Sequence, residues 1–401
     1  MSPDMYPSTP PQTSPGFASS YDVVVVGARA AGAATAMLLA QAGLHVLVVE
    51  RSAPGSDTLS THALMRGGVM QLHRWGLLDT IIEAGTPAIR RTSFSYADER
   101  IDITIKPSHG VDALYAPRRT LLDATIARAA GEAGADVRFH TTVTGLLRDH
   151  GRDRITGVRL QTADGRVHEA RAALVIGADG IRSIVANGTA AAVRRQGRHM
   201  SAVTYGYWSG LETTGYEWVF RTDACSGVIP TNDGRTCVFA GARPERIGRG
   251  GVGTIEEIIA RGDPALAERL ARAQPPTGTR TWAGHRGYLR QAHGPGWALV
   301  GDAGYFKDPI SAHGLTDALR DAELLARAVI AGFGDDARMT EYLDEFEALR
   351  DRLSITLFET VDRIASNEWD DAEIAQLLIQ LSSAMADEVD TLAALDLERV
   401  S

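Results

Sequence analysis

The stretch from Val23 to Glu50, "VVVVGARAAGAATAMLLAQAGLHVLVVE", constrains the fold more than any other part of the chain. It reads as a β-branched apolar strand, a tight turn, a helix rich in small residues, and a second strand that ends in an acid. Small residues at the start of a helix let the helix lie close to the preceding strand. The order therefore predicts a βαβ unit in a parallel sheet, with Gly43 ending the helix.

The turn of this unit has the spacing of a dinucleotide-binding loop but lacks its middle glycine. Gly27 and Gly32 stand at the first and third glycine positions, and Arg29 occupies the second. Glu50 follows Gly32 by about 20 residues, where an acid that accepts hydrogen bonds from a ribose is expected. We predict a dinucleotide-binding loop in which Arg29 adopts a backbone conformation open to any residue and places its guanidinium beside the phosphates. The alternative is a plain βαβ unit with Glu50 as an edge residue.

Composition narrows the class of protein. A chain of 401 residues can bury a large core. Its formal charge of −9 argues against a nucleic-acid partner or an anionic membrane surface, and no apolar run is long enough to be inserted into a bilayer. With two cysteines, Cys225 and Cys237, neither a disulfide framework nor a metal site is predicted. Residues 1–20, rich in Pro and Ser, predict a disordered leader without a signal peptide, and hence a cytoplasmic protein.

Two further loops follow short apolar strands. The segment "ALVIGADG" places Asp179 and Gly180 after the first of these strands. The segment "WALVGDAG" places Gly301 and Asp302 after the second, and a helix with an apolar stripe is predicted to begin near Gly314. Both resemble the first loop in their position at the end of a buried strand.

Together with the segment "PRRTLLD", which holds Arg119 and Asp123, these motifs resemble the FAD-dependent monooxygenases of the para-hydroxybenzoate hydroxylase fold, a superfamily shared with geranylgeranyl reductases. The resemblance runs from about Tyr21 to Val329. It implies an α/β fold, with a Rossmann-like FAD-binding domain, an inserted substrate domain on a mostly antiparallel sheet, and C-terminal helices. The implied boundaries are 21–80, 112–185 and 285–335 for the FAD-binding domain, 81–111 and 186–284 for the substrate domain, and 336–401 for the helical region.

The resemblance implies FAD as the cofactor and assigns residues to its parts. Members of this class often replace the middle glycine, which accounts for Arg29. The residues implied around the pyrophosphate and adenosine are Gly27, Ala28, Arg29, Ala31, Gly32, Glu50, Arg51, Arg119 and the backbone of Val143. Those implied around the ribityl chain and the flavin ring are Asp302, Pro309, Gly314 and Leu315. Asp179 is tied to both FAD and NAD(P)H, or is a simple turn residue. NAD(P)H would bind transiently to the same domain.

Alternating aromatic residues mark the predicted substrate domain. The segments "VTYGYWSG" and "GYEWVF" each place aromatic side chains on one face of a strand. They are candidate walls of a pocket for a flat, apolar or aromatic substrate, or else the core of the sheet. The residues concerned are Tyr205, Tyr207, Tyr216, Trp218 and Phe220.

Two histidines are candidates for the reaction site. His313 directly precedes the helix that the resemblance places at the flavin, where the helix dipole would lower its pKa and keep the imidazole neutral as a catalytic proton shuttle. The alternative is a turn residue packed against Tyr305 or Phe306. His62 would lie near the flavin edge; we expect a loop histidine hydrogen-bonded to backbone, with FAD bound non-covalently, rather than a histidyl–flavin bond.

The activity that the resemblance implies is that of a monooxygenase. Such an enzyme uses NAD(P)H and O2 to hydroxylate or oxidise a small, aromatic or apolar substrate through a flavin hydroperoxide. The alternative is a prenyl reductase, because "YEWVF" is similar to the Y-x-W-x-F-P motif of geranylgeranyl reductases, although Arg221 replaces the proline. A halogenase would need a W-x-W-x-I-P motif, which is missing. A flavoprotein without turnover that binds a pathway intermediate is a further alternative.

Overall fold

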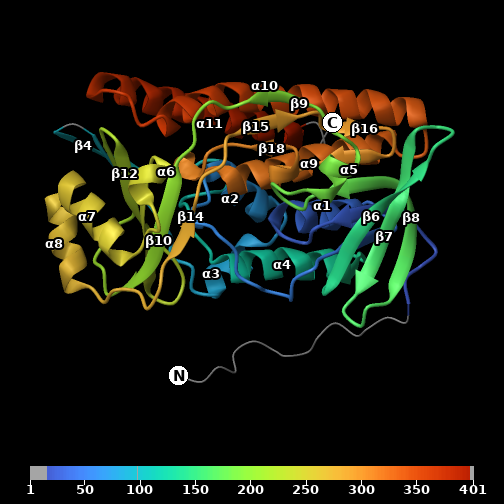
Figure 1. The fold of residues 1–401 in the computed structure, drawn as a ribbon, viewed down its shortest axis with the longest axis horizontal. Coiled ribbons are helices and arrows are strands. Elements are labelled where there is room, and N and C mark those ends of the chain that lie inside the picture. Colours follow the sequence, from blue (N-terminus) through green and yellow to red (C-terminus); the bar gives the residue numbers. More distant parts are fainter. Residues whose placement is uncertain (1–15, 97, 398–401) are drawn as a thin grey trace.

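The computed structural model describes residues 16–96 and 98–397. It shows a parallel sheet covered by helices, a mostly antiparallel second sheet, and two long C-terminal helices that run along one side of both (Figure 1). The predicted α/β class is confirmed. Of the predicted leader, residues 1–15 lie outside the described part of the chain, whereas Ser20 already belongs to the first strand, β1 (Ser20–Val26).

The first sheet contains the βαβ unit that the sequence predicts. Its strand order is β16 (His293–Gly294), β17 (Trp297–Leu299), β8 (Val167–Gly177), β1, β2 (Val46–Val49) and β5 (Asp136–Arg138). All neighbours pair in parallel except β16 and β17. The long β8 also pairs antiparallel with β7 (Arg154–Thr162), which pairs with β6 (Thr141–Asp149). Because the central strands are covered on both faces, they carry runs of buried Val and Ile.

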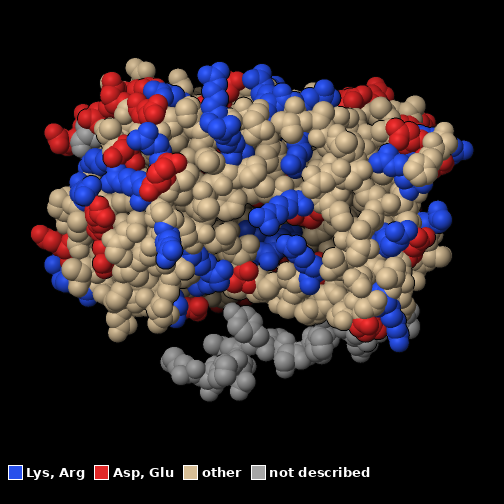
Figure 2. Space-filling model, in the orientation of Figure 1, with Lys and Arg blue, Asp and Glu red and all other residues tan. Residues whose placement is uncertain are grey.

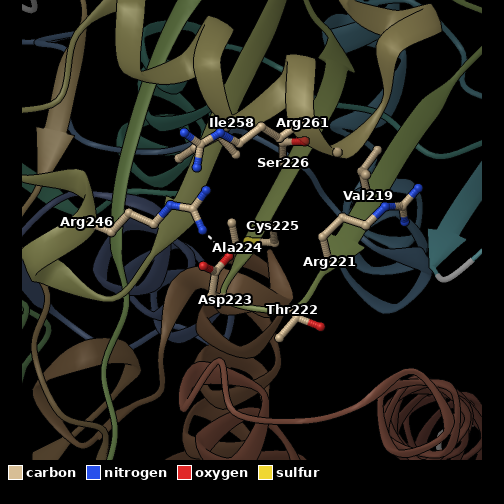
Figure 3. Close-up of a pocket in the computed structure, with 11 residues that line it drawn as sticks. Val219, Arg221, Thr222, Asp223, Ala224, Cys225, Ser226, Arg246, Ile258 and Arg261 are labelled. Carbon is tan, nitrogen blue, oxygen red and sulfur yellow. Dashed lines mark hydrogen bonds and ion pairs between the residues drawn. The ribbon is translucent and has the colours of Figure 1, made fainter.

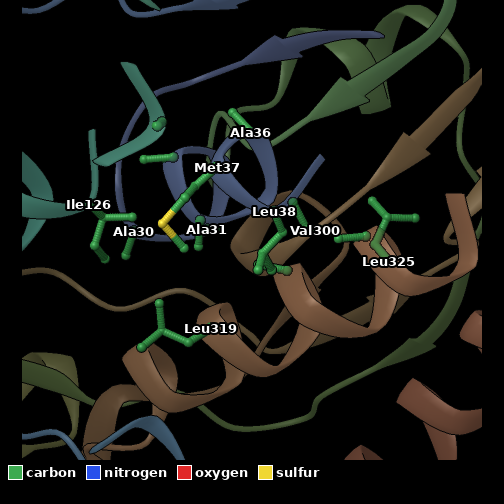
Figure 4. Packing of buried hydrophobic residues seen from close by; sticks show 14 of the residues in the cluster. Ala30, Ala31, Ala36, Met37, Leu38, Ile126, Val300, Leu319 and Leu325 are labelled. Carbon is green, nitrogen blue, oxygen red and sulfur yellow. The ribbon is translucent and has the colours of Figure 1, made fainter. Parts of the chain in front are cut away.

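Three helices cover one face of this sheet. α1 (Ala30–Gln41) lies against both α4 (Arg119–Glu132) and α9 (Gly314–Gly332). Figure 4 shows small side chains of α1 in this layer, with Met37 pointing toward Ile126 of α4 and Leu38 toward α9. Small residues allow three helices to approach one sheet closely. As predicted, α9 begins at Gly314, and Gly43 takes a positive φ of 88° after the end of α1.

The second sheet forms the other half of the molecule. Its order is β14 (Arg280–Trp282), β10 (Ala202–Ser209), β13 (Arg235–Ala242), β12 (Ala224–Pro230), β11 (Tyr216–Arg221), β3 (Arg91–Tyr96) and β4 (Glu99–Thr104). The pairs are antiparallel except for β11 with β3. Its outer face is covered by α6 (Pro244–Ile247), α7 (Val252–Gly262) and α8 (Pro264–Arg272).

The C-terminal helices connect the two halves. α10 (Asp336–Ala365) packs on α9, and α11 (Asp371–Leu397) packs on α10 and on α2 (Arg66–Arg74). Among the helices of the described residues, none combines the length and apolar character that crossing a bilayer requires. The remaining elements are α3 (Leu78–Glu83), α5 (Ile184–Gly188), η1 (Gly301–Ala303), η2 (Pro309–Ser311), β9 (Val193–Gln196), β15 (Tyr288–Arg290) and β18 (Tyr305–Phe306).

Candidate functional site

The loop between β1 and α1 shows why two glycines are needed and a third is not. Gly27 has a φ of 102°, and a Cβ on it would lie 2.5 Å from the carbonyl oxygen of Ala178. A Cβ on Gly32 would lie 1.9 Å from the carbonyl oxygen of Gly27. Arg29, the N-cap of α1, has φ −88° and ψ −173°, an extended conformation that any residue adopts. The prediction for the Arg29 backbone is confirmed.

A pocket opens beside this loop, between the end of β2 and the start of α4. The residues that line it are Ala28, Arg29, Glu50, Ala53, Gly55, Ser56, Asp123 and Phe139. Figure 2 shows Lys and Arg side chains gathered around a hollow near the middle of one face of the molecule. Nη1 of Arg29 is buried and has no hydrogen-bond partner among the described residues. Because a buried donor without an acceptor is costly, a phosphate oxygen at this position would stabilise the loop. The chemistry of this donor therefore suits the pyrophosphate of FAD.

Two carboxylates hold the pocket in shape. Glu50 accepts hydrogen bonds from the backbone N–H of Ala28 at 3.2 Å and of Ser52 at 2.9 Å. Asp123 accepts from the backbone N–H of Ala30 at 3.1 Å and from two nitrogens of Arg119 at 3.1 and 2.9 Å. Asp123 lines the pocket but was not assigned to the cofactor from the sequence, although its spacing of four from Arg119 on one helix was a signal for the pair.

Three other residues were predicted to contact the nucleotide, and the structure gives their positions and exposure. Arg51 follows Glu50 and is exposed, and Val143 is buried in β6. Ala31 lies in the first turn of α1, where its Cβ is 3.0 Å from the position that a Cβ on Gly301 would take. The cofactor contacts assigned to these residues stay predictions.

Asp179 has a local role. Its Oδ2 accepts a hydrogen bond of 2.6 Å from the backbone N–H of Ile184, at the start of the short helix α5. Burial raises the pKa of the Asp179 carboxyl, and the hydrogen bonds that it accepts oppose this shift. The turn alternative is therefore observed directly, while its link to FAD and NAD(P)H stays a prediction.

Asp302 lies in η1, directly after Gly301, where an added Cβ would be 3.0 Å from Cβ of Ala31 in the first turn of α1. The residue is exposed to solvent, but the surrounding protein atoms desolvate the carboxyl and raise its pKa to about 6, against the opposing effect of Arg119 and Lys307. Next to Asp302, Pro309 is half-buried and Gly314 is exposed, whereas Leu315 is buried. The first backbone N–H groups of α9 at this point have no partner within the helix, which suits a ring that carries negative charge.

The segment after β2 runs to the start of α9. The backbone N–H of Met65 donates to Oγ1 of Thr316, in the first turn of α9, at 3.1 Å. His62, just before, is buried, with a φ of 70°. Its Nε2 lies 2.5 Å from the hydroxyl of Tyr207 on β10. Burial, and then the neighbouring Arg118, hold the pKa of His62 well below its usual range, so the ring is neutral.

Tyr207 is held from both sides. His62 stacks on it with ring centroids 5.7 Å apart, and the guanidinium of Arg118 lies 4.0 Å from its ring centroid. The neighbouring Tyr205 hydroxyl accepts a hydrogen bond from the backbone N–H of Ser60 at 3.1 Å. The expected backbone partner of the His62 ring is thus wrong: its partner is a side chain of the second sheet. Since Nε2 is engaged and the ring is buried, this geometry disfavours a histidyl–flavin bond.

The other predicted aromatic residues lie in the core. Tyr216, Trp218 and Phe220 on β11 are buried in one hydrophobic cluster with residues of the C-terminal helices. Nε1 of Trp218 donates to Thr92, and Phe220 contacts the ring of Trp369. Tyr205 is buried in the same cluster, so the structure places four of the five aromatic residues in the core, and Tyr207 packs partly buried against it. The substrate contacts assigned to all five stay predictions.

His313 belongs to a buried network of charges. It is the N-cap of α9, and its Nε2 lies 3.1 Å from Oε1 of Glu388 on α11. Glu388 also accepts from Arg320 at 2.8 Å, and Lys307 pairs with Asp317. Burial lowers the pKa of His313, against the effect of Glu388, so the predicted direction agrees while the main cause is desolvation rather than the helix dipole.

This network could be mistaken for a metal centre. His313, Asp317 and Glu388 bring ligand atoms within 4.8 Å of one another. However, Arg320 contacts both carboxylates and Lys307 contacts Asp317, so two cations already neutralise them. We assign no metal here. Glu388 was not predictable as a partner of His313, because it lies in a helix that carries no motif.

Replacing Arg29 by alanine is expected to weaken FAD binding by about 1–3 kcal/mol, the range for losing a charge-assisted hydrogen bond. The buried, unpartnered Nη1 is the physical reason. Titration of the apoprotein with FAD measures the change. Arg128→Ala, on the exposed side of α4, is the control, and unchanged FAD affinity in Arg29→Ala would mean that the guanidinium does not contact the pyrophosphate.

FAD affinity is also expected to fall as the pH drops below about 6, the pKa of Asp302. Above this pH both carboxylate oxygens accept hydrogen bonds from the ribityl hydroxyls, and below it the protonated oxygen becomes a donor, at a cost of about 0.5–1.5 kcal/mol per acceptor interaction lost. Titrations of the apoprotein over a pH series measure this. Asp302→Asn should remove the dependence; a variant that keeps the wild-type pH profile contradicts the assignment.

Comparisons with known proteins agree with this geometry. The model of a family described as "FAD binding domain" matches residues 20–358. Digeranylgeranylglycerophospholipid reductase 2 of Methanopyrus kandleri is 25% identical over 348 residues, which cover 82% of this chain and 81% of that protein. The structure of the flavin-dependent brominase Bmp2 is similar with a TM-score of 0.76 and 20% identity, covering 93% of each chain.

A third similar structure is PqsL, "a probable FAD-dependent monooxygenase" from Pseudomonas aeruginosa, with a TM-score of 0.75, 20% identity, and coverage of 90% of this chain and 99% of that one. The family match spans most of the chain and includes the nucleotide loop, Asp179 and Asp302. The chain belongs to this family of FAD-binding domain proteins, and is an FAD-dependent oxidoreductase of the superfamily that joins para-hydroxybenzoate hydroxylase and geranylgeranyl reductase.

Proposed function

We propose that the protein is an NAD(P)H- and O2-dependent monooxygenase that acts on a small aromatic substrate. One observation carries the proposal: the wall that the second sheet presents near the α9 N-terminus is polar, with Tyr207 held between His62 and Arg118. Hydroxyl and guanidinium groups suit the phenol or carboxylate of a small aromatic compound. They do not suit a long hydrocarbon chain, which offers no hydrogen-bond partner.

The residues of the chain hold and orient the cofactor in this proposal. Arg29 and the loop glycines bind the pyrophosphate, and Asp302 accepts from the ribityl hydroxyls. When bound and reduced, FAD supplies the reaction with dioxygen that delivers one oxygen atom to the substrate. The N-terminus of α9, at Gly314, stabilises negative charge next to the ring. The second sheet would cover the substrate site and exclude water from it.

A prenyl reductase is the second candidate, because the curated relative from Methanopyrus kandleri carries that name. Two observations weigh against it. The three aromatic residues of "YEWVF" are buried in the core, and Arg221 stands where the proline of the reductase motif belongs. The side chain of Arg221 does not join this core; it lines a cavity on the outer face of the second sheet (Figure 3).

The two candidates differ in their need for oxygen. The test follows NAD(P)H oxidation and oxygen uptake by the FAD-loaded protein with a set of small phenols and aromatic carboxylic acids, and with a geranylgeranyl lipid. We expect an aromatic compound to stimulate both rates together. Anaerobic reoxidation of the reduced protein by the geranylgeranyl lipid, with no stimulation by any aromatic compound, contradicts the proposal.

His313→Ala is expected to retain FAD and its reduction by NAD(P)H, but to form product roughly tenfold or more slowly and to release more hydrogen peroxide per product. The reason is the loss of a neutral imidazole directly before the exposed Gly314. The variant His313→Gln can still donate a hydrogen bond to Glu388 but cannot transfer a proton. It therefore separates a structural role of His313 from a role in proton transfer. Wild-type coupling of NAD(P)H to product in both variants would leave His313 with the sole role of joining α9 to α11.

A further inference from the structure

The strand β4 ends the second sheet and has a free edge. Among the described residues it pairs only with β3, and Figure 1 shows it at the outer end of the sheet, at the periphery of the molecule. All six of its residues are exposed, and none of them is assigned to FAD or to the substrate. Because a free edge presents backbone N–H and C=O groups to solvent, it can pair with a further strand.

The pairing with β3 shows which backbone groups of β4 are free. The backbone N–H of Ile105, directly after β4, donates to the carbonyl oxygen of Arg90 at 2.9 Å. In an antiparallel pair, successive residues direct their backbone groups alternately toward the neighbouring strand and away from it. Counting back from Ile105 along the regular register, the backbone groups of Ile101 face β3, and those of Arg100 and Asp102 face away from it.

One face of β4 is apolar. Ile101 and Ile103 lie on this face, and they are 41% and 44% exposed. Ile101 lies opposite Phe94 of β3, which packs against the hydrophobic cluster of the second sheet. Residues opposite each other in a sheet share one face, so the two isoleucines continue this cluster to the edge of the sheet. Adjacent apolar side chains exposed in this way are typical of a surface that binds another molecule.

The other face of β4 carries opposite charges. Nε of Arg100 lies 3.4 Å from Oδ1 of Asp102, and Nη2 of Arg100 donates to Oγ of Ser93 on β3 at 3.1 Å. The side chains of Arg100 and Asp102 are 44% and 48% exposed, so solvent screens this pair within one chain. An arginine and an aspartate two positions apart on one face are also self-complementary, because a second, antiparallel copy of the strand can place each arginine opposite an aspartate.

The charges select one register for such a pair of strands. Residues directly opposite each other must lie on the same face, so the two-fold axis of the pair passes beside one residue of each strand. With the axis at Ile101, Arg100 of each copy faces Asp102 of the other, and the two Ile101 side chains face each other. With the axis at Arg100 or at Asp102, like charges face each other, which is destabilising. In the register at Ile101, the outward backbone groups of Arg100 and Asp102 are also the ones that exchange hydrogen bonds.

We propose that β4 pairs with β4 of a second copy of this chain, antiparallel and centred on Ile101, so that the second sheets of the two copies form one continuous sheet. A strand of six residues is a small contact for a permanent interface, so the dimer is reversible and its population rises with protein concentration. The nucleotide loop belongs to the first sheet, and the dimer leaves it accessible. The inference goes beyond the proposed monooxygenase activity and does not depend on it.

Sedimentation velocity of the FAD-loaded protein over a series of concentrations tests the proposal. We expect a reversible equilibrium of monomer and dimer for the wild type. The variant Arg100→Glu has acids at both positions, and Asp102→Arg has arginines at both, so each faces like charges across the axis and should raise the Kd of the dimer at least roughly tenfold. An equimolar mixture of the two variants restores opposite charges in both pairs and should dimerise again, which misfolded variants would not do.

Ile101→Lys is expected to weaken the dimer as well, because it places two ammonium groups at the axis. Its matched control is Ile379→Lys on α11, where the isoleucine is 69% exposed and lies outside β4; this variant should dimerise like the wild type. The flavin absorbance spectrum of every variant should stay that of the wild type. Wild-type protein that is monomeric at all concentrations, a dimer that neither charge variant weakens, or a mixture of the two that stays monomeric would overturn the proposal. So would an equal loss of dimer in Ile379→Lys, which would mean non-specific apolar association.

Discussion

Replacing Arg320 by alanine is expected to lower the free energy of unfolding by about 3–5 kcal/mol, the range for removing one partner of a buried ion pair. Arg320 is fully buried and donates to Asp317 at 3.1 Å, to Asp321 at 2.8 Å and to Glu388 at 2.8 Å. Without it, three buried carboxylates lose their shared cation. Because Glu388 lies on α11 and the others on α9, the contact between these two helices should weaken most.

Urea unfolding of the FAD-loaded protein measures this loss. Arg159→Ala, which breaks an exposed pair with Glu169, is the control and should cost no more than about 1 kcal/mol. A loss in Arg320→Ala as small as in this control would contradict a structural role of the network. Arg320→Met tests whether volume alone is enough, and we expect it to recover only part of the loss.

Replacing Gly32 by alanine is expected to abolish stable FAD binding and to destabilise the protein. The new Cβ would lie 1.9 Å from the carbonyl oxygen of Gly27 and 2.9 Å from Cβ of Ala178, so the nucleotide loop must move. Overpacking of this kind costs about 1–3 kcal/mol and occasionally more. The moved loop would no longer present Arg29 and the α1 N-terminus to a pyrophosphate.

The matched control for this variant is Gly131→Ala. Gly131 lies within α4, and a Cβ there would meet only Val137 Cγ2, at 3.8 Å. Alanine should be neutral or stabilising by up to about 1 kcal/mol at this helical position. FAD content after gel filtration and thermal unfolding compare the two variants. A Gly32→Ala protein that retains FAD like the control would show that the loop does not need a close approach at Gly32.

Local patterns in the sequence predicted much of the first sheet. The buried strand before Gly27, the small residues of α1 and the start of α9 at Gly314 all depend on spacing along the chain. The extended backbone of Arg29 was also predictable, because only Gly27 and Gly32 need the absence of a side chain. These features arise within a few turns of one element, where periodicity and turn chemistry decide the structure.

Contacts between distant segments were not predictable in this way. His62 and Tyr207 are 145 residues apart in sequence, and His313 and Glu388 are 75 apart. The alternation in "YEWVF" predicts that its aromatic residues share one face of the strand. It does not predict that the C-terminal helices cover this face, as they do in the structure. Which buried face becomes a site and which becomes core therefore depends on the tertiary arrangement.

The incorporation of labelled dioxygen tests the proposed monooxygenase activity most directly. The FAD-loaded protein is supplied with NAD(P)H, isotopically labelled O2 and the aromatic compound that most stimulates oxygen uptake, and the product is analysed by mass spectrometry. We predict a product that contains one labelled oxygen atom per molecule, formed as NAD(P)H is consumed. A product without label, or one in which a carbon–carbon double bond has gained two hydrogens, would contradict this account.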